Sequence, residues 1–320
     1  MATSGTVTYA TSRTKIISLA MKNIGKLGEE ESPTASEGVD AGDFLNMMLK
    51  NWMARADFAP GLKLWKRRRA DLYFEEDSNS FSLGPSGGHW TETSYSRTLT
   101  AASPAADTTL TCSAITNASS GDYIGIELDS GDIHWTTING APSGSTITIT
   151  AAIPTGQTAS SGNYVFNYTT KANRPDSIEA VVLRDVNGDD VPVRIMTMED
   201  YFALPTKADT TATSDPSAVY YEAQLTNGTL YLDVGGVQDV TKKLVISWME
   251  PIEDMTAAAD ELDMPQVWYL PVVLGLSKLI CPMFNGVWSQ DNETNYMAAL
   301  LGAREAYPET TSAHFQPGVD

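Results

Sequence analysis

The order of the hydrophobic patterns along the chain is the feature that most constrains its fold. Apolar residues with helical spacing come first, at Lys15–Leu27 and Asp40–Arg55. The middle of the chain changes to the two-residue alternation of β-strands, and an apolar helical block returns at Pro265–Ala306. None of these helices can bury a wide apolar face by itself. The sequence therefore predicts an α+β fold, in which the N- and C-terminal helices form a helical bundle and the long middle is all-β.

Capping residues predict where these helices begin and end. Ser12 or Thr14 can cap the first helix, and Gly28 can end it. In the C-terminal block, Pro271 must either kink a helix or begin a new segment, and Pro282 ends it.

A change of composition divides the β middle. Between Thr91 and Thr170 the chain is rich in Ser, Thr, Gly and Ala, and Arg97 is the only basic residue. Short alternating runs separated by turn residues are typical of a β-sandwich, so this stretch is predicted to be an inserted β module. The expected domains are an N-terminal helical hairpin at 1–64, a central β domain at 65–90 and 171–250, the inserted module at 91–170, C-terminal helices at 251–306 and a flexible tail at 307–320.

The acidic balance disfavours one class of function. The sequence contains 40 Asp and Glu residues but only 21 Lys and Arg residues, which gives a formal net charge of −19. A sequence-specific DNA-binding protein needs a basic face for the phosphates, whereas an acidic wall suits a channel that must not hold the duplex. The start lacks the regions of a signal peptide, and no apolar run is long enough to span a membrane. With Cys112 and Cys281 as the only cysteines, we expect a soluble protein made in a reducing compartment.

Residues that could carry catalysis or bind a metal are sparse. Three histidines are far apart in sequence, and no HExxH, GxSxG, Walker A or GxGxxG motif occurs. The segment Asp185–Asp190 is similar to a calcium loop, but its glycine is fourth and its twelfth residue is Met196 instead of glutamate. Hairpin turns are predicted at Asn187-Gly188 and Asn227-Gly228 instead. We expect no enzymatic activity, no metal and no cofactor.

A cluster of basic residues stands out against the acidic background. Its members are Lys63, Lys66, Arg67, Arg68 and Arg69. Three interpretations stay open: a nucleic-acid patch, a solvated strand edge whose charge blocks unwanted pairing, or a contact with an acidic patch on a neighbouring subunit. The third fits an acidic oligomer best, because the cluster would offset part of the self-repulsion.

The segment after Ala306 is polar and holds three residues suited to binding. Tyr307, His314 and Phe315 are potential anchors on a strand that can order when it meets a partner. Together with the basic cluster, they form the predicted subunit or portal interface.

Several short motifs carry a resemblance to a known family through their order and spacing. The second helix has a Leu/Met-rich run ending in Trp52, and Gly61-Leu-Lys-Leu-Trp65 leads into the sheet. The later motifs are Arg174-Pro175, Met198-Glu-Asp-Tyr201 with Leu204 and Lys207, Trp248-Met-Glu-Pro251, and Asp263-Met-Pro265-Gln-Val-Trp268. In this order they resemble head-to-tail adaptor (connector) proteins of tailed bacteriophages, especially those of short-tailed phages. Pro271 departs from the family, which usually has an uninterrupted helix there.

The resemblance implies a structural protein of the virion, made in the host cytoplasm and placed at the head-tail junction. It implies a homo-oligomeric ring, commonly of twelve subunits, that docks beneath the portal protein and seats the tail or its nozzle. Double-stranded DNA would pass through without sequence-specific binding, and no membrane would be involved. The inserted module at 91–170 would decorate the periphery.

Two alternatives stay open. The first is a tail-tube or nozzle protein of the same kind of virion. The second is a β-rich carbohydrate-binding protein, in which Trp90, Tyr123, Trp135 and Tyr164 would stack on sugar rings. The alternation of these aromatic residues with polar residues favours a place in a β-sandwich core instead.

Overall fold

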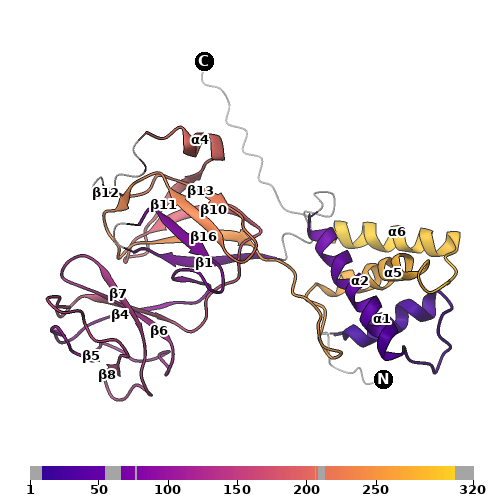
Figure 1. The fold of residues 1–320 in the computed structure, drawn as a ribbon, viewed down its shortest axis with the longest axis horizontal. Coiled ribbons are helices and arrows are strands. Elements are labelled where there is room, and N and C mark those ends of the chain that lie inside the picture. The colour runs from indigo at the N-terminus through magenta and orange to yellow at the C-terminus, as the bar shows by residue number, and fades with distance from the viewer. Residues whose placement is uncertain (1–8, 55–65, 76–77, 206, 208–212, 307–320) are drawn as a thin grey trace, which may run out of the picture. The chain divides into compact units, whose positions relative to one another are not determined.

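A computed structural model describes residues 9–54, 66–75, 78–205, 207 and 213–306. The chain divides into two compact units (Figure 1). One contains Met1–Arg67 and Pro251–Asp320, so the two ends of the chain share it, and the other contains Arg68–Glu250. They are called the helical unit and the β unit below.

The helical unit is arranged around helix α5. Its elements are α1 (Arg13–Asn23), α2 (Ala35–Ala54), the short 3-10 helix η2 (Gln266–Trp268), α5 (Tyr269–Ile280) and α6 (Gln290–Glu305). Helix α5 packs against α1, α2 and α6. Pro271 falls in its first turn, where a missing N–H costs no helical hydrogen bond, so the residue begins a helix instead of kinking one.

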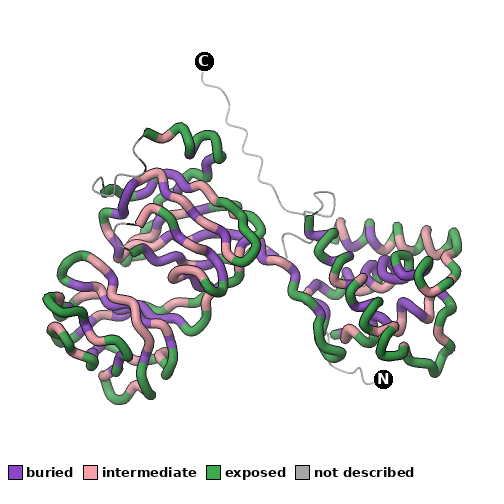
Figure 2. The backbone as a smooth tube through the Cα atoms, in the orientation of Figure 1, coloured by how far each residue is buried: buried purple, intermediate pink, exposed green. Residues whose placement is uncertain are grey.

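The core of the helical unit includes side chains from a loop as well as from helices. Ile16, Leu45, Trp268 and Leu276 are almost fully buried at its centre, as the tube in Figure 2 shows for their helices. The irregular segment before η2 adds further buried apolar residues, namely Ile252, Met255, Leu262 and Met264.

The β unit contains a large curved sheet with the strand order β2-β14-β13-β11-β10-β16-β1-β3, which nearly closes into a barrel. Its strands are β1 (Arg67–Tyr73), β2 (Ser80–Leu83), β3 (Trp90–Thr91), β10 (Ser177–Arg184), β11 (Asp190–Ile195), β13 (Ala218–Glu222), β14 (Gly228–Leu232) and β16 (Lys243–Met249). Strand β11 runs parallel to β13, and β10 runs antiparallel to both β11 and β16. The short helix α4 (Met198–Phe202) follows β11, and β12 (Thr213–Ser214) pairs with β15 (Gly236–Val237).

The stretch between β3 and β10 forms its own two small sheets. One has the order β4-β9-β6-β7, and the other pairs β5 with β8. The strands are β4 (Tyr95–Thr98), β5 (Thr109–Thr111), β6 (Tyr123–Glu127), β7 (Ile133–Thr137), β8 (Thr146–Thr148) and β9 (Tyr164–Tyr168). Leu110, Ile124, Ile147 and Val165 are completely buried in a cluster confined to this stretch.

The predicted fold class, an α+β protein built on a helical bundle, is wrong. The protein is mostly β, its main body is the barrel-like sheet, and the described residues form only five α-helices. The reason lies in how the terminal helices are covered. They are 11 to 20 residues long, and loop side chains such as Met255 and Leu262 fill part of their core. The apolar faces are therefore buried without the continuous seam that a bundle requires.

Two observed helix boundaries differ from the predicted ones because of local capping interactions. Helix α2 begins five residues before Asp40, because Thr34 and Glu37 cap each other: the Thr34 amide donates to the Glu37 carboxylate, and the Glu37 amide donates to the Thr34 hydroxyl. Ser12 caps α1, but that helix ends at Asn23, and Gly25 with φ +75° follows it in place of Gly28.

Candidate interaction surface

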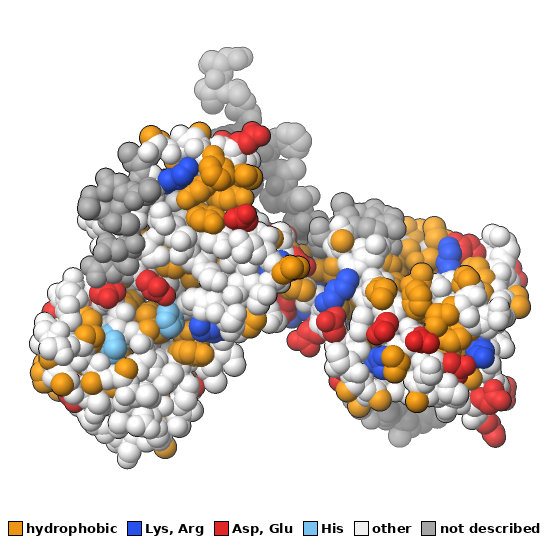
Figure 3. Space-filling model, in the orientation of Figure 1, with side chains coloured by type: hydrophobic (Ala, Val, Ile, Leu, Met, Phe, Trp, Pro, Cys, Tyr) orange, Lys and Arg blue, Asp and Glu red, His pale blue; other side chains and the backbone are white. Residues whose placement is uncertain are grey.

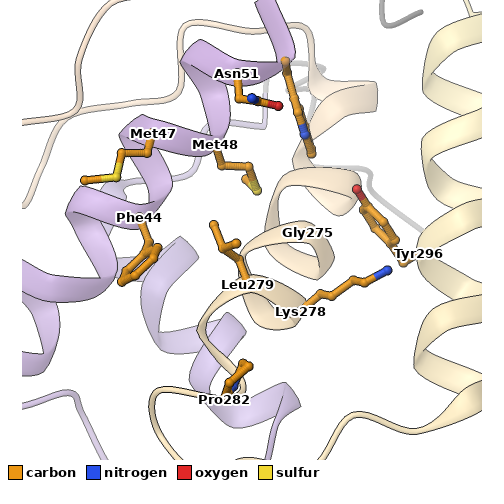
Figure 4. Close-up of a pocket in the computed structure, with 10 residues that line it drawn as sticks. Phe44, Met47, Met48, Asn51, Gly275, Lys278, Leu279, Pro282 and Tyr296 are labelled. Atoms are coloured by element: carbon orange, nitrogen blue, oxygen red, sulfur yellow. The ribbon is translucent and has the colours of Figure 1, made fainter. Parts of the chain in front are cut away.

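The helical unit carries an open apolar groove of about 640 Å³ between α2, α5 and α6. Figure 4 shows how its walls are built, with Met48 and Leu279 pointing toward each other across the space. The lining residues are Phe44, Met47, Met48, Asn51, Trp52, Gly275, Lys278, Leu279, Pro282 and Tyr296. We refer to this surface as the α2/α5/α6 groove.

The floor of the groove depends on a glycine. A Cβ atom at Gly275 would lie 3.0 Å from Cζ2 of Trp52 and 3.1 Å from Sδ of Met48, closer than most side-chain contacts. The Trp52 ring also packs at 52° against Trp268, with the ring centroids 5.9 Å apart. The absence of a side chain on α5 therefore lets Trp52 form the floor while its other face stays in the core.

Large apolar side chains remain exposed in and beside the groove. Met47 is 62% exposed and Leu279 is 42% exposed, and on α6 Met297 and Leu301 are each more than half exposed. Figure 3 shows such apolar side chains among scattered charges on the visible face of the helical unit. Methionine side chains adapt to differently shaped partners, so this surface is suited to contact with another polypeptide.

One cation stands at the rim of the groove. The Nζ atom of Lys278 lies 2.7 Å from the carboxylate of Glu293 and 5.5 Å from the ring centroid of Tyr296. Hydrogen bonds from Lys278 and then from Trp288 hold the pKa of Glu293 below its usual range. Among the lining residues Lys278 is the only charged one, and its charge is balanced by Glu293 beside the groove.

Another face of α5 has a second hollow, of about 470 Å³. Its lining includes Tyr9 and Leu19 on one side and Tyr269, Leu270 and Val273 on the other. The rings of Tyr9 and Tyr269 pack at 55° with their centroids 5.9 Å apart. The helical unit therefore has two apolar hollows with different lining residues.

The structure places the predicted basic cluster in several environments. The Lys66 side chain is 1% exposed and pairs with Asp263, and Nε of Arg68 lies 3.1 Å from a carboxylate oxygen of Glu250. Arg69 borders a small hollow on the sheet, and Lys63 lies outside the described residues. Lys66 is thus buried against an acidic residue of its own chain, and the contact of the cluster with a neighbouring subunit stays a prediction.

The predicted anchors Tyr307, His314 and Phe315 lie outside the described residues. The groove itself was missed by sequence reasoning. The helical pattern placed Phe44, Met48 and Trp52 on one broad apolar face, and the structure divides that face between the core and the open groove. The breadth of the face was the signal that could have indicated a second apolar contact.

The aromatic residues of the carbohydrate hypothesis pack against the protein. Trp90 is completely buried, with its Nε1 donating to the carbonyl of Asn173 at 3.1 Å. Trp135 and Tyr164 are half-buried against the same core cluster, and Tyr123 stacks on Tyr168 with the ring centroids 4.9 Å apart. Trp90 is therefore a core residue, but of the large sheet and not of the inserted stretch.

The loop at Asp185–Asp190 is organised as a turn. One carboxylate oxygen of Asp185 accepts the amides of Asn187 and Asp189, each at 2.9 Å, and Gly188 has φ +93°. Among the described residues no group of three or more His, Cys, Asp or Glu side chains is placed to hold a metal ion.

The sequence matches no protein-family model and no curated protein. Within the part of the chain that the structure describes, no helix is both long and apolar enough to cross a membrane.

Proposed function

We propose that this protein is a structural head-to-tail adaptor of a tailed bacteriophage, which forms a ring beneath the portal and seats the tail. The observation that supports it most is the α2/α5/α6 groove. An apolar hollow of about 640 Å³ with Met47 62% exposed is a surface that protein contacts normally cover. The order of the sequence motifs, which resembles the adaptor family, supplies the setting.

A ring requires two different contact surfaces on each subunit. Head-to-tail contacts close into a ring when one patch of a subunit meets another patch of the next. The groove and the hollow around Tyr269 and Leu270 are two such patches on different faces of α5. Leu270 is 59% exposed and is suited to enter the groove of a neighbour.

The negative charge of the chain is consistent with a channel that does not bind DNA, and it opposes the association of free subunits. A subunit with a formal charge of −19 repels its copies, and salt screens this repulsion. Docking on a portal ring would hold subunits close together and raise their effective concentration. We therefore expect monomers or small oligomers in solution and a complete ring on the portal.

Negative-stain electron microscopy of the purified protein, alone and mixed with portal rings, tests the proposal. Added ring density on one end of the portal is the expected result. Replacement of Met47 by Glu should abolish this density, because it buries a carboxylate in the groove, while Val39→Glu on the exposed side of the same helix should leave it intact. Lack of portal binding at any salt concentration would overturn the proposal, and binding to tail fragments alone would favour the nozzle alternative.

A further inference from the structure

We propose that Asn139 is a site of covalent self-modification, at which the chain converts the side-chain amide into a mixture of aspartate and isoaspartate. The reaction needs no enzyme, because its nucleophile is the backbone nitrogen of Gly140, and solvent water is the only other reactant. It belongs to the inserted stretch alone and does not depend on the phage role.

The modification proceeds through a cyclic imide. The Gly140 nitrogen, after losing its proton to hydroxide, attacks Cγ of Asn139. The new N–C bond forms as the bond from Cγ to Nδ2 breaks, and ammonia leaves. Water then adds to one of the two carbonyl carbons of the succinimide and reopens the ring, which gives aspartate or isoaspartate. In isoaspartate the main chain runs through the former side chain.

Four Asn-Gly pairs occur in the sequence, and glycine hinders this attack least because it carries no side chain next to the nitrogen. The pairs are Asn139-Gly140, Asn187-Gly188, Asn227-Gly228 and Asn285-Gly286. The fold can separate them through two conditions. The glycine N–H must be free to lose its proton, and the asparagine side chain must be free to bend toward the nitrogen.

The pair Asn139-Gly140 meets both conditions. Both residues are exposed in the connection between β7 and β8, and Gly140 has φ +80°. Within the part of the chain that the structure describes, neither the Gly140 amide nor the Asn139 side chain takes part in a hydrogen bond. A Cβ atom at Gly140 would meet nothing within 4 Å, so the imide ring has room to form.

Hydrogen bonds oppose the reaction at Asn187-Gly188. The Gly188 amide donates to the Asp185 carbonyl at 3.2 Å, and Nδ2 of Asn187 donates to the Asp185 carboxylate at 3.2 Å. A hydrogen-bonded N–H gives up its proton less readily. The carboxylate of Asp185 also repels the hydroxide that would remove this proton.

The other two pairs are also held in place. Nδ2 and Oδ1 of Asn227 lie 3.0 Å and 3.3 Å from Oγ of Ser86, and Gly228 is buried in β14. The Gly286 amide donates to the Cys281 carbonyl at 3.0 Å. Each of these pairs therefore fails at least one of the two conditions.

The product would change the joint between β7 and β8. Ile138 is 2% exposed and bridges Ile149, and the Asn139 amide donates to the Thr148 carbonyl at 2.8 Å. Isoaspartate adds one methylene group to the main chain directly after this bridge. Both products also add a negative charge, so the modified chain differs from the original in backbone length and in charge.

Timed incubation of the full chain at mildly alkaline pH tests the proposal. Peptides from the folded protein and from the same protein in guanidinium chloride are analysed by mass spectrometry, which detects the gain of about 1 Da at each modified asparagine. Asn139 should react in the folded chain at a rate within about threefold of its rate in the unfolded chain. The other three asparagines should each slow by at least about tenfold on folding, because the fold restrains only those pairs.

Two results would overturn the proposal. One is slowing of the Asn139 reaction on folding by as much as that of the other pairs. The other is formation of aspartate without isoaspartate, which fragmentation by electron transfer distinguishes, because it would indicate direct hydrolysis of the side chain instead of attack by Gly140.

A matched pair of variants identifies the attacking nitrogen. Gly140→Ala should slow the modification at least about fivefold, because a methyl group crowds the attack. Gly144→Ala is the control: Gly144 lies in the same connection, has φ +63° and also has nothing within 4 Å of a Cβ atom. This control should leave the rate at Asn139 unchanged. Equal rates in the two variants would exclude the Gly140 nitrogen as the nucleophile.

Discussion

His89 stacks flat on Trp135, with the ring centroids 3.6 Å apart and the planes 10° apart. The two residues come from different parts of the β unit, because His89 precedes β3 of the large sheet and Trp135 lies on β7 of the inserted stretch. His89 Nδ1 also forms a 2.8 Å hydrogen bond with the Tyr168 hydroxyl. This contact joins the inserted stretch to the sheet through a half-buried titratable group.

The β unit should lose stability on mild acidification because of His89. Burial, and to a lesser extent Lys171, lowers the pKa of His89 from 6.5 to about 3. The folded protein therefore keeps the imidazole neutral, and the unfolded chain takes up a proton once the pH falls below about 6.5. At pH 5.5 the loss should be at most about 1.4 kcal/mol relative to pH 8. Thermal unfolding followed by tryptophan fluorescence at the two pH values measures it.

Two variants distinguish the contribution of His89 to the pH dependence of stability from that of other titratable groups. His89→Gln should remove most of the pH dependence between 8 and 5.5, whereas His134→Gln, at a partly exposed position of β7, should preserve it. Equal pH dependence in the two variants would show that the stacked pair is not the source.

Truncation of a buried residue should destabilise the helical unit far more than truncation of an exposed residue that lines the groove. Trp52 is 5% exposed and Leu276 is completely buried. Trp52→Ala and Leu276→Ala should each cost about 3–5 kcal/mol, because each leaves a cavity. Met47→Ala, which also lines the groove but is 62% exposed, should cost less than about 1 kcal/mol. Urea unfolding of the three variants by circular dichroism provides the comparison, and similar losses for all three would contradict the assignment of core and rim.

The buried pair of Lys66 and Asp263 should respond unequally to removal of each partner. Asp263→Ala leaves an ammonium group in a site that is 1% exposed, and breaking a buried ion pair in this way costs about 3–5 kcal/mol. Lys66→Met replaces the cation by an apolar group of similar length, so its cost should be smaller. Equilibrium unfolding in urea ranks the two, and a larger loss for Lys66→Met would show that the pair stabilises the fold in itself.

The inserted stretch should fold when produced alone. Its cluster around Leu110, Ile124 and Val165 is complete within residues 92–170. We expect a fragment of these residues to give a dispersed amide spectrum by nuclear magnetic resonance and a cooperative thermal transition. Phe166 and Trp135 pack on Tyr73 of the sheet, so the fragment should be less stable than the same residues in the full chain. A spectrum without dispersion would show that the large sheet is needed for folding.

The sequence predicted the local elements better than their assembly. The start of α4 follows from local chemistry, because Thr197 and Asp200 form a capping box there. Five residues separate the strands in both hairpins. Asn187-Gly188 lies within the turn between β10 and β11, whereas Asn227 ends the connection between β13 and β14 and Gly228 is the first residue of β14. These local features follow from capping and turn chemistry within a few residues.

Long-range contacts were beyond the reach of such patterns. Nothing in the sequence around Lys66 shows that Asp263, 197 residues away, will bury it. Nor does a periodic pattern reveal that β2 pairs with β14, or that loop side chains such as Met255 will help to cover the terminal helices. The helical bundle was predicted because apolar faces need cover, and the sequence pattern does not specify which residues provide it.

The ion pair of Arg68 and Glu250 brings together the two ends of the β unit. These are the first and last residues of the β unit, and their side chains meet at 3.1 Å. The ends of the β unit therefore lie next to each other, as do the ends of domains that tolerate insertion into a host. We therefore expect that a different domain with adjacent ends can replace the β unit without changing the spacing of the two chain segments that enter and leave it.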